Sequence, residues 1–366
     1  MNLCMLVDKP MPSERPTGIG VAAFNMALYL SKHHKVEFIC RGVVDQVQEL
    51  NDNFTIRTLR RYSRDNVSVL SRILRQDRCD LIHIHSSAAF PSLVLAKASR
   101  KKIVVHSHGA EGLHPIRLTL IRNASMVLCD RVIAVSKDTR AKVSRINRIP
   151  IRKIAVAYNG VNAEEFKPTH VSPNNLSKYN FASFDNLILS VGAVQGRKGQ
   201  WAILECLPQI LQQYPNSVYV NVGAAYDKFY QKELLERAER LGVSNSVRWM
   251  ERVSHEDLVE LINASSVCVQ PSLGEPFGLA VVEEMACGKS VVAFNSGALP
   301  EIIDDGENGI LVAPNNLPAL TQAVLGELSD PGRSRKLGEA ARLKVLAKFT
   351  WDATAFQLEE IYRDLT

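Results

Sequence analysis

Short apolar runs alternate with helix-like segments along the whole chain, and this alternation restricts the fold more than any other feature. Runs rich in Val, Ile and Leu with few polar residues are typical of strands buried on both faces of a parallel sheet. Helix-like patterns at residues 21–30 and 91–98 separate neighbouring runs, as expected when helices cover such a sheet. The sequence therefore predicts an α/β fold. The expected strands are residues 3–7, 36–40, 81–85, 103–106, 131–135 and 154–158, and then 187–191, 217–222, 247–249, 267–270, 290–294 and 309–312.

The two sets of expected strands indicate two domains. A segment rich in Asn, Ser and Pro, residues 159–186, separates them, and 366 residues suffice for two domains of about 150–200 residues each. We expect two doubly wound domains that face each other across a cleft, with ligands outside the carboxyl ends of the strands. The expected domains are residues 1–165 and 166–348, and residues 349–366 are expected to form an amphipathic helix that returns to the first domain.

Cysteine usage and hydropathy predict a cytoplasmic protein. The seven cysteines are scattered and form no C-x-x-C pair, which is typical of small reduced core residues. No apolar run reaches 18 residues, so a membrane-spanning helix is not expected. The first ten residues lack a basic n-region and soon include a charged residue, so we expect a strand there rather than a signal peptide.

The positive charge of the chain is concentrated in its first half. The net charge is +6, but residues 1–160 hold 26 Lys and Arg against 12 Asp and Glu. This half favours an acidic partner, such as an anionic membrane surface. The basic segment 57–75 carries Leu70, Ile73 and Leu74 at helical spacing, so it is either a helix that covers the core or an interfacial helix that meets lipid. Nucleic acid is not expected, because aromatic residues do not interleave with this charge.

The strongest chemical signal is the segment GEPFGLAVVEEMACGKSVVAF at residues 274–294. It places Glu275 and Glu283 eight residues apart across a glycine turn that opens a helix, which we expect to end at Gly288. The N-terminus of a helix attracts phosphate, Glu275 before the turn can reach a sugar, and Glu283 can accept hydrogen bonds from vicinal hydroxyls. The segment predicts a nucleotide-sugar site, with a helix N-terminus carrying incidental acids as the alternative.

Two glycine-containing segments are candidate phosphate loops. Gly18 and Gly20 form a G-x-G-x-x-A pattern, but ten residues with three prolines follow the first strand, so a nicotinamide site is not expected. The alternatives are a loop that closes over a phosphorylated ligand and a plain helix cap. The second segment leaves the strand 187–191 and carries Arg197 and Lys198, which are either a diphosphate clamp or an exposed basic turn.

Five histidines lie close together in the first half of the sequence. Alternation along a strand puts His83 and His85 on one face, and likewise His106 and His108. A metal site is not expected, because no H-E-x-x-H motif or cysteine pair accompanies these histidines. The fifth histidine, His114, does not complete such a motif either. His108, at the end of its strand, is the imidazole best placed for the cleft, whereas His83 is expected in the core.

These segments, taken in order, resemble the retaining GT-B glycosyltransferases of glycosyltransferase family 4, whose two domains are Rossmann-like. The resemblance spans nearly the whole chain, and its most specific part is the E-x7-E segment followed by Met285-Ala286-x-Gly288. The other matching segments are residues 17–20, 80–85, 105–109, 132–136, 159–162, 197–199 and 297–301.

The resemblance implies that a hexose is transferred from a nucleotide-sugar, expected to be a UDP-sugar, with retention of configuration and without a metal or cofactor. Glu283 would hold the ribose hydroxyls and Glu275 the sugar hydroxyls, while Lys198, with Arg197, would neutralise charge on the departing diphosphate. The other implied site residues are His108 on the reacting face of the sugar, Gly278, Leu279, Phe277 and Gly192 at the donor, Val253 at the base, and Gly18 and Gly20 at the phosphates and acceptor.

One departure from the family pattern concerns the second glycine-containing segment. The family usually has Arg directly after the glycine, where this chain has Ala193, and Arg197 is close enough in sequence to replace it. We expect a glycosyltransferase that acts at the inner face of the membrane on an envelope polysaccharide or lipid-linked acceptor. The alternatives are a nucleotide-sugar epimerase of the same architecture and a non-catalytic sugar-nucleotide-binding protein, the latter suggested by Ala193.

Overall fold

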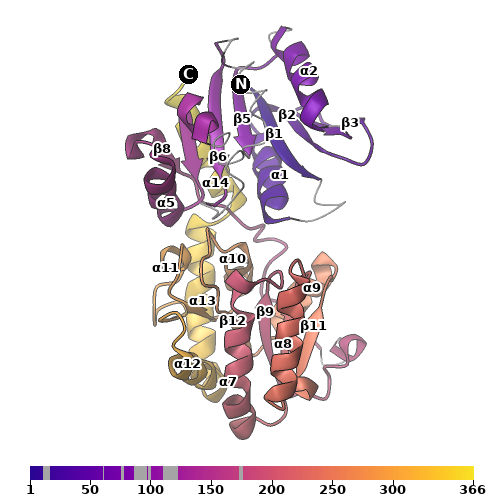
Figure 1. Cartoon of the computed structure of the whole chain (residues 1–366), viewed down its shortest axis with the longest axis vertical. Coiled ribbons are helices and arrows are strands. Elements are labelled where there is room, and N and C mark those ends of the chain that lie inside the picture. The colour runs from indigo at the N-terminus through magenta and orange to yellow at the C-terminus, as the bar shows by residue number, and fades with distance from the viewer. Residues whose placement is uncertain are drawn as a thin grey trace. The chain divides into compact units, whose positions relative to one another are not determined.

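The computed structural model divides into two compact units (Figure 1). Unit 1 comprises Met1–Gly160 and Trp351–Thr366, and unit 2 comprises Val161–Thr350, so the expected boundaries at 165 and 348 differ from these by a few residues. The structure describes residues 1–10, 17–60, 62–75, 78–85, 97, 100–109, 123–172 and 176–366. The expected helix at 91–98, apart from Lys97, and His114 lie outside the described residues.

Unit 1 contains an eight-stranded sheet in the order β3-β4-β2-β1-β5-β6-β7-β8. Neighbouring strands are parallel except for β3 and β4, which are antiparallel. The six strands expected in this half are present, but β3 and β4 were not expected. The edge strand β3 exposes all its residues and therefore lacks the apolar pattern that reveals a strand. The bounds are β1 Asn2–Pro10, β2 Lys35–Arg41, β3 Gln46–Asn51, β4 Phe54–Leu59, β5 Leu81–His85, β6 Lys102–Ser107, β7 Arg131–Ala134 and β8 Ile154–Val156.

The first helix of unit 1, α1 (Gly18–Leu30), begins directly at the predicted glycine pattern. Thr17 caps it, and its side-chain oxygen accepts a hydrogen bond from the backbone N–H of Gly20 at 3.1 Å. Gly18 and Gly20 are therefore first-turn residues of a capped helix, which agrees with the second of the two alternatives, a plain helix cap. Residues 11–16, which precede them, lie outside the described part of the chain.

The basic segment of unit 1 forms α2 (Tyr62–Arg75). Leu70 and Ile73 are buried in the hydrophobic core of this unit together with strand residues such as Ile39 and Ile82. An interfacial helix would direct these side chains into lipid. The structure thus favours a helix that covers the core and corrects the interfacial alternative.

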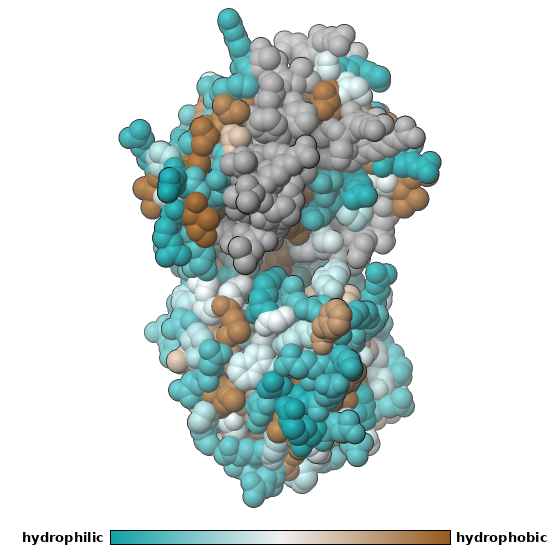
Figure 2. All heavy atoms as spheres, in the orientation of Figure 1, coloured by the Kyte–Doolittle hydropathy of each residue, from teal (hydrophilic) through white to brown (hydrophobic). Residues whose placement is uncertain are grey.

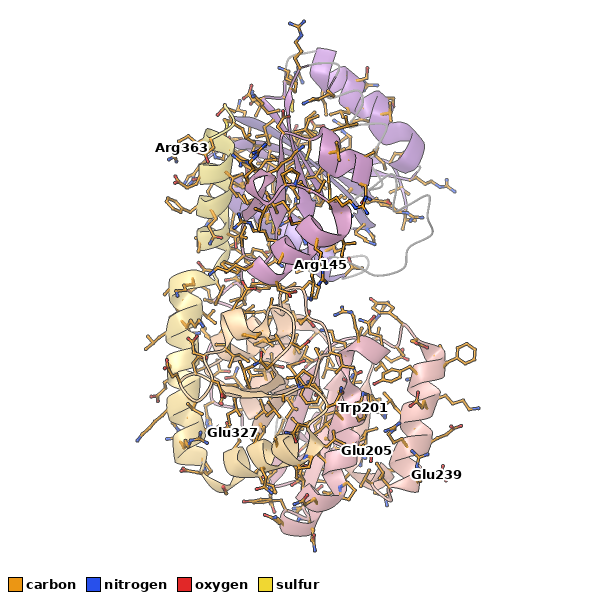
Figure 3. The ribbon with its side chains drawn as sticks, turned by 60° about the vertical axis from the view of Figure 1, so that its left-hand side comes forward. Arg145, Trp201, Glu205, Glu239, Glu327 and Arg363 are labelled. Atoms are coloured by element: carbon orange, nitrogen blue, oxygen red, sulfur yellow. The ribbon has the colours of Figure 1, made fainter. Side chains whose placement is uncertain are left out.

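The last helix, α14 (Trp351–Arg363), belongs to unit 1, although it follows unit 2 in sequence. It packs against α1, where Lys32 Nζ lies 2.5 Å from Asp352 Oδ1. The Tyr158 backbone N–H donates to Gln357 Oε1 at 3.0 Å, and the Tyr362 ring is fully buried. Arg363, labelled in Figure 3, ends the helix. Among the described residues, unit 1 also contains helix α5 (Lys137–Asn147).

Unit 2 contains a six-stranded parallel sheet in the order β11-β10-β9-β12-β13-β14. All six expected strands of this half are present. The strands are β9 Asn186–Val191, β10 Ser217–Val222, β11 Val247–Met250, β12 Val267–Gln270, β13 Val291–Phe294 and β14 Ile310–Val312. The helices are α7 Gln200–Gln213, α8 Lys228–Arg240, α9 His255–Ala264, α10 Leu279–Ala286, α11 Leu299–Ile302, α12 Leu317–Ser329 and α13 Pro331–Lys348.

Helices of unit 2 pack on the sheet through a continuous apolar core and are joined at the surface by ion pairs. Arg237 of α8 donates to Glu205 of α7 at 2.6 Å and lies over the ring of Trp201, and Figure 3 labels Glu205 and Trp201. Because the side chains of such pairs are partly exposed, each pair contributes little to the free energy of unfolding. Burial of apolar surface therefore supplies most of the stability.

The surface carries scattered hydrophobic side chains. On the face drawn in Figure 2 they lie among hydrophilic ones. Within the described ranges, the structure contains no helix that is long and apolar enough to cross a bilayer. All seven cysteines are free and buried, as expected of small core residues.

Candidate active site

Two loops of unit 2 meet where the strand order of its sheet reverses. The order runs outward from β9 in one direction and from β12 in the other, and these two strands are hydrogen-bonded neighbours. The glycine-containing segment after β9 and the E-x7-E segment after β12 therefore leave the same edge of the sheet side by side. In doubly wound sheets, ligands bind in the crevice at this position.

The centre of this site is an ion pair between Lys198 and Glu275. Lys198 Nζ lies 2.7 Å from Glu275 Oε2, and both side chains are largely buried, with 14% and 11% exposed. Arg197 Nη1 lies 3.5 Å from the same oxygen and is 46% exposed. Two cations from one loop thus converge on one carboxylate from the other. Arg197 Nη1 also lies 3.4 Å from the Gly274 carbonyl oxygen.

Glycines and a buried glutamine fix the loop that carries the two cations. The chain turns at Gly199 with φ +69°, and a Cβ there would lie 2.0 Å from the Pro271 carbonyl oxygen, so only glycine fits. Gln200 Nε2 donates to the Ala193 carbonyl at 2.9 Å. A Cβ at Gly192 would be in ordinary van der Waals contact with the Lys198 side chain, 3.4 Å from its Cε. The loop therefore has a defined conformation that directs Lys198 toward Glu275.

Helix α10 begins beside this pair, as the sequence predicts. Its N-cap is Gly278 with φ +115°, and the chain leaves the helix through Gly288 with φ +75°. The backbone N–H groups of the first turn, which begins at Leu279, have no acceptor within the helix and attract an anion. Half-buried Glu283 lies in the second turn.

The two predicted carboxylates have opposite electrostatic properties. Burial raises the pKa of Glu275, but the charges of Lys198 and Arg197, with hydrogen bonds from Lys198 and Ser272, outweigh it and leave the pKa below its ordinary value. Burial raises the pKa of Glu283 to about 8, against a smaller opposite effect of Lys198. At pH 7 two cations therefore face one carboxylate and one mostly neutral carboxyl group. This surplus of positive charge suits a diphosphate.

A third acid, Glu284, lies beneath the site and was missed from the sequence. It is fully buried, and Gln270 Nε2 donates to its Oε1 at 2.6 Å and to the Val191 carbonyl at 3.2 Å. Burial raises its pKa well above the ordinary value, so it is neutral. Gln270 and Glu284 thus connect the ends of β9 and β12 to α10. In the sequence, the polar Gln270 at the end of an otherwise apolar strand was the one feature that could have indicated a buried polar partner such as Glu284.

Two other predicted donor residues lie in different surroundings. The Phe277 ring is only 3% exposed and packs edge-on against Phe349, with ring centroids 5.9 Å apart. It is a core side chain, so a direct contact of this ring with a ligand is not supported. Val253 lies in the loop between β11 and α9, half-buried and next to the N-cap Ser254.

Gly297 holds the backbone of the site in place. Its φ is +61°, and a Cβ there would lie 2.3 Å from the Glu275 carbonyl oxygen, while the next residue, Ala298, donates its N–H to that oxygen at 2.8 Å.

We expect Gly297→Ala to destabilise the protein by at least about 2 kcal/mol in urea unfolding, because it adds backbone strain and a clash. Gly306→Ala is the matched control, since Gly306 has φ +77° and open space around it. Equal losses in both variants would contradict the role given to the clash.

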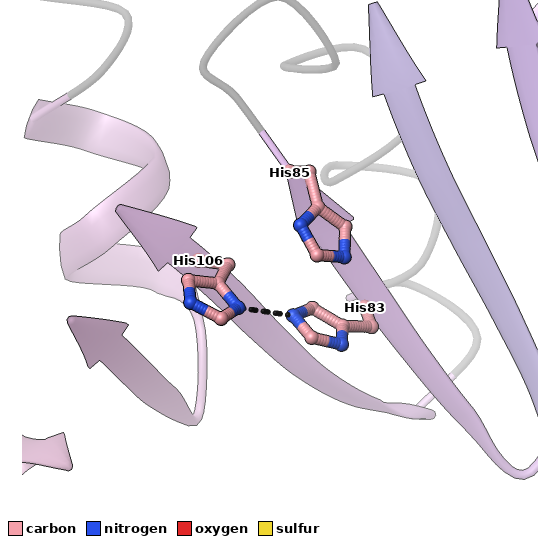
Figure 4. Close-up of side chains that lie close together, drawn as sticks. All are labelled: His83, His85 and His106. Atoms are coloured by element: carbon pink, nitrogen blue, oxygen red, sulfur yellow. Dashed lines mark hydrogen bonds between the residues drawn. The ribbon is translucent and has the colours of Figure 1, made fainter. Parts of the chain in front are cut away.

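The predicted histidines of unit 1 form a buried stack. The rings of His83 and His85 stack at 4.2 Å and those of His106 and His108 at 4.6 Å, which confirms that each pair shares a face. His83 Nε2 lies 3.1 Å from His106 Nδ1 (Figure 4), and His83 Nδ1 lies 2.6 Å from the Tyr362 hydroxyl. His83 is therefore a satisfied core residue, as expected.

Hydrogen bonds join the rings of the stack in pairs, His83 with His106 and His85 with His108. One nitrogen from each of His83, His85 and His106 lies within 4.8 Å of the others. The rings of His83 and His85 stack at an interplanar angle of 25°, and His83 is hydrogen-bonded to His106 (Figure 4). Burial lowers the pKa of all four imidazoles, in His108 to about 4, so they are neutral at pH 7.

Two doubly wound units, one with a cationic loop opposite a carboxylate at its switch point, define the class of GT-B glycosyltransferases. Solved structures of this class share the fold over the whole chain. Sucrose-phosphate synthase from Thermosynechococcus elongatus has a TM-score of 0.83, with 21% identity and 99% and 98% of the two chains covered. Anabaena HepE in complex with UDP-glucose has a TM-score of 0.81, with 20% identity and 99% of each chain covered.

Sequence comparison identifies the family. Residues 16–165 match the family described as Glycosyltransferase Family 4, and residues 171–344 match Glycosyl transferases group 1. An uncharacterized glycosyltransferase of Methanocaldococcus jannaschii is 30% identical over 306 residues, which cover 80% of this chain and 77% of that protein. A D-inositol 3-phosphate glycosyltransferase of Streptomyces bingchenggensis is 31% identical over 64% of this chain and 53% of its own length. The chain belongs to the family 4 glycosyltransferases, as the resemblance indicated.

Proposed function

We propose that the protein is a retaining hexosyltransferase that uses a UDP-sugar and an envelope polysaccharide or lipid-linked acceptor. The observation that carries this proposal is the largely buried Lys198–Glu275 pair, 2.7 Å long, at the switch point beside the N-terminus of α10. Support for the donor comes from HepE, which shares the fold and was solved with UDP and with UDP-glucose. The acceptor is proposed from the basic character of the first half of the chain.

In the proposed reaction, the bond between the anomeric carbon and the diphosphate oxygen breaks, and its electron pair stays on the diphosphate. Lys198 and Arg197 stabilise this charge, while the first turn of α10, from Gly278 and Leu279, binds phosphate or sugar oxygens. The acceptor oxygen attacks on the same face of the sugar and passes its proton to the leaving diphosphate. No side chain acts as a nucleophile.

The remaining proposed roles concern binding. Glu275 accepts hydrogen bonds from sugar hydroxyls and Glu283 from the ribose hydroxyls, and the backbone of Val253 contacts the base. Gly192 allows a close approach to the phosphates, and His108 contacts the transferred sugar. Gly18 and Gly20 contribute the N-terminus of α1 at the phosphates or acceptor. We propose that no metal is required, because two side-chain cations supply the charge that a divalent ion would; turnover in EDTA tests this.

A thermal-shift screen with UDP-, GDP- and ADP-sugars tests the donor. A ligand at 100 times its dissociation constant should stabilise the fold by about 2.7 kcal/mol. UDP should then be released only when an acceptor is added, and the anomeric configuration of the product is read by NMR. Donor isomerised without acceptor would instead indicate an epimerase, and binding without turnover a non-catalytic protein.

Membrane attachment is a separate part of the proposal. Flotation with vesicles that contain anionic lipid at moderate salt should recover the protein, and neutral vesicles should recover less. Because α2 buries Leu70 and Ile73, we expect this attachment to rest mainly on charge and to disappear at high salt. Failure to float on anionic vesicles would remove the membrane from the proposal and leave the donor chemistry intact.

Donor affinity should depend on pH through Glu283. Its pKa of about 8 means that only about a tenth of the protein carries the Glu283 carboxylate at pH 7. The carboxylate accepts two ribose hydroxyls better than the neutral acid, so affinity for UDP should rise about tenfold per pH unit up to pH 8 and then level. Calorimetry between pH 6 and pH 9 measures this. Glu283→Gln should bind more weakly with a flat profile, and an unchanged slope in that variant would refute the assignment.

A further inference from the structure

His108 is held by one histidine of the stack at the carboxyl end of the unit 1 sheet. His85 Nδ1 lies 2.9 Å from His108 Nε2, and the His85 ring is fully buried. The ring planes are tilted by 30°, which suits a hydrogen bond between nitrogens in neighbouring rings. His108 itself is half-buried. Its Nε2 is therefore occupied from within the protein, and no residue of the described ranges hydrogen-bonds to its Nδ1, which leaves that nitrogen for a ligand.

Two neutral imidazoles that share one hydrogen bond have two possible proton arrangements. Either His85 Nδ1–H donates to His108 Nε2, or His108 Nε2–H donates to His85 Nδ1. The arrangement decides what the remaining nitrogen of His108 offers. In the first case His108 Nδ1 carries a proton and is a donor, and in the second it is a lone-pair acceptor.

The second ring nitrogen of His85, Nε2, indicates which proton arrangement is present. This nitrogen is buried and has no hydrogen-bond partner among the residues that the structure describes. In the first arrangement this nitrogen is a bare acceptor, and in the second it is an N–H donor without an acceptor. Buried N–H groups without a partner are the rarer of the two in folded proteins. The surroundings of His85 therefore favour the first arrangement.

We infer that His85 is a positioning residue that holds His108 in the tautomer protonated on Nδ1, so that His108 offers a hydrogen-bond donor to an oxygen of the transferred sugar. The part of this inference that concerns the sugar rests on the proposed function. The tautomer itself is a property of the free protein. The stack supports the role, because His106 packs against both rings, at 5.1 Å from His85 and 4.6 Å from His108, and restrains their rotation.

Imidazole nitrogen NMR of the ¹⁵N-histidine-labelled full chain tests the tautomer, with His108→Gln to assign the signal. Wild type should show a protonated Nδ1 in His108. His85→Leu should leave the tautomer of His108 mixed, whereas His85→Asn should preserve it, because the Asn side-chain amide nitrogen occupies the place of His Nδ1. His83→Leu is the matched control, since His83 is equally buried in the same strand but bonds to Tyr362 and His106 instead.

Kinetics provide the second readout. His85→Leu should lower kcat about tenfold, roughly the value of one ordinary hydrogen bond, with little change in donor KM, and His85→Asn should restore most of it. A proton on Nε2 of wild-type His108 would overturn the inference, even if His85→Leu did not fold. Equal kcat losses in the His83→Leu and His85→Leu variants would also overturn it. Absence of turnover in wild type with every donor would overturn the proposed function alone.

Discussion

Replacing Lys198 with alanine should lower the rate of sugar transfer by about 10²–10³, measured as UDP release at saturating donor. The ammonium group is largely buried and lies against Glu275, so it meets a departing diphosphate with little screening by water. Without Lys198, only Arg197 and the Ser272 hydrogen bond oppose the effect of burial on Glu275, so the pKa of this carboxyl should rise. The variant therefore removes one positive charge from the site and also makes Glu275 a weaker acid.

Arg197→Ala is the informative comparison. Arg197 is 46% exposed and lies 3.5 Å from Glu275, so its charge is screened and its removal should cost less than that of Lys198. Lys228→Ala is a control for general loss of charge, because Lys228 is exposed and makes only long contacts of 3.4 Å, with Gln231 and Glu251. Circular dichroism should accompany each assay, since breaking a buried ion pair can destabilise the fold. Wild-type turnover in Lys198→Ala would refute the central role of this site.

Acid should destabilise unit 1 between pH 7 and pH 5.5 while leaving unit 2 stable. In folded unit 1 the pKa values of four buried histidines lie below the ordinary value of about 6.5. Below pH 6.5 the unfolded chain binds protons that the folded chain does not, so stability falls as pH falls. At pH 5.5 this amounts to about 1.4 kcal/mol for each histidine whose folded pKa is well below 5.5.

The carboxyl groups of unit 2 act in the opposite direction. Glu283 and Glu284 have raised pKa values in the fold, so the stability they contribute is lost as pH rises above about 4.5 and regained in mild acid. Hydrogen exchange read by mass spectrometry separates the two units, and protection should fall in β5 and β6 but not in β9 and β12. In His83→Leu, the dependence of unit 1 stability on pH should be shallower. Parallel loss of protection in both units would contradict this account.

The sequence predicted the elements whose pattern is local. Buried parallel strands appear in the sequence as apolar runs. The two ends of α10 were predicted correctly, because the backbone takes positive φ at Gly278 and Gly288 and glycine is favoured there. By contrast, β3 has no buried face and thus no pattern. At the glycine pattern the sequence left a phosphate loop and a plain helix cap as alternatives, and the Thr17 cap places Gly18 and Gly20 in the first turn of α1.

Contacts between distant segments were less accessible. Lys198 meets Glu275 only because β9 and β12 are neighbours, which depends on strand order rather than on either segment. Alternation put His83 and His85 on one face, but the His85–His108 contact requires the register that places His85 opposite His106. Glu284 resembles any helix-surface acid until Gln270 is known to lie against it.

The return of α14 to unit 1 has a consequence for the order of folding during synthesis. Tyr362, which hydrogen-bonds to His83 of the histidine stack, is synthesised after the whole of unit 2. Unit 2 is a continuous segment and can fold as soon as it has emerged, whereas the earlier-made unit 1 waits for the final helix. The nascent chain must therefore keep an unfinished domain from aggregating while the later one folds. A released chain that ends at residue 350 should therefore contain a unit 2 that resists protease and a unit 1 that is sensitive to it.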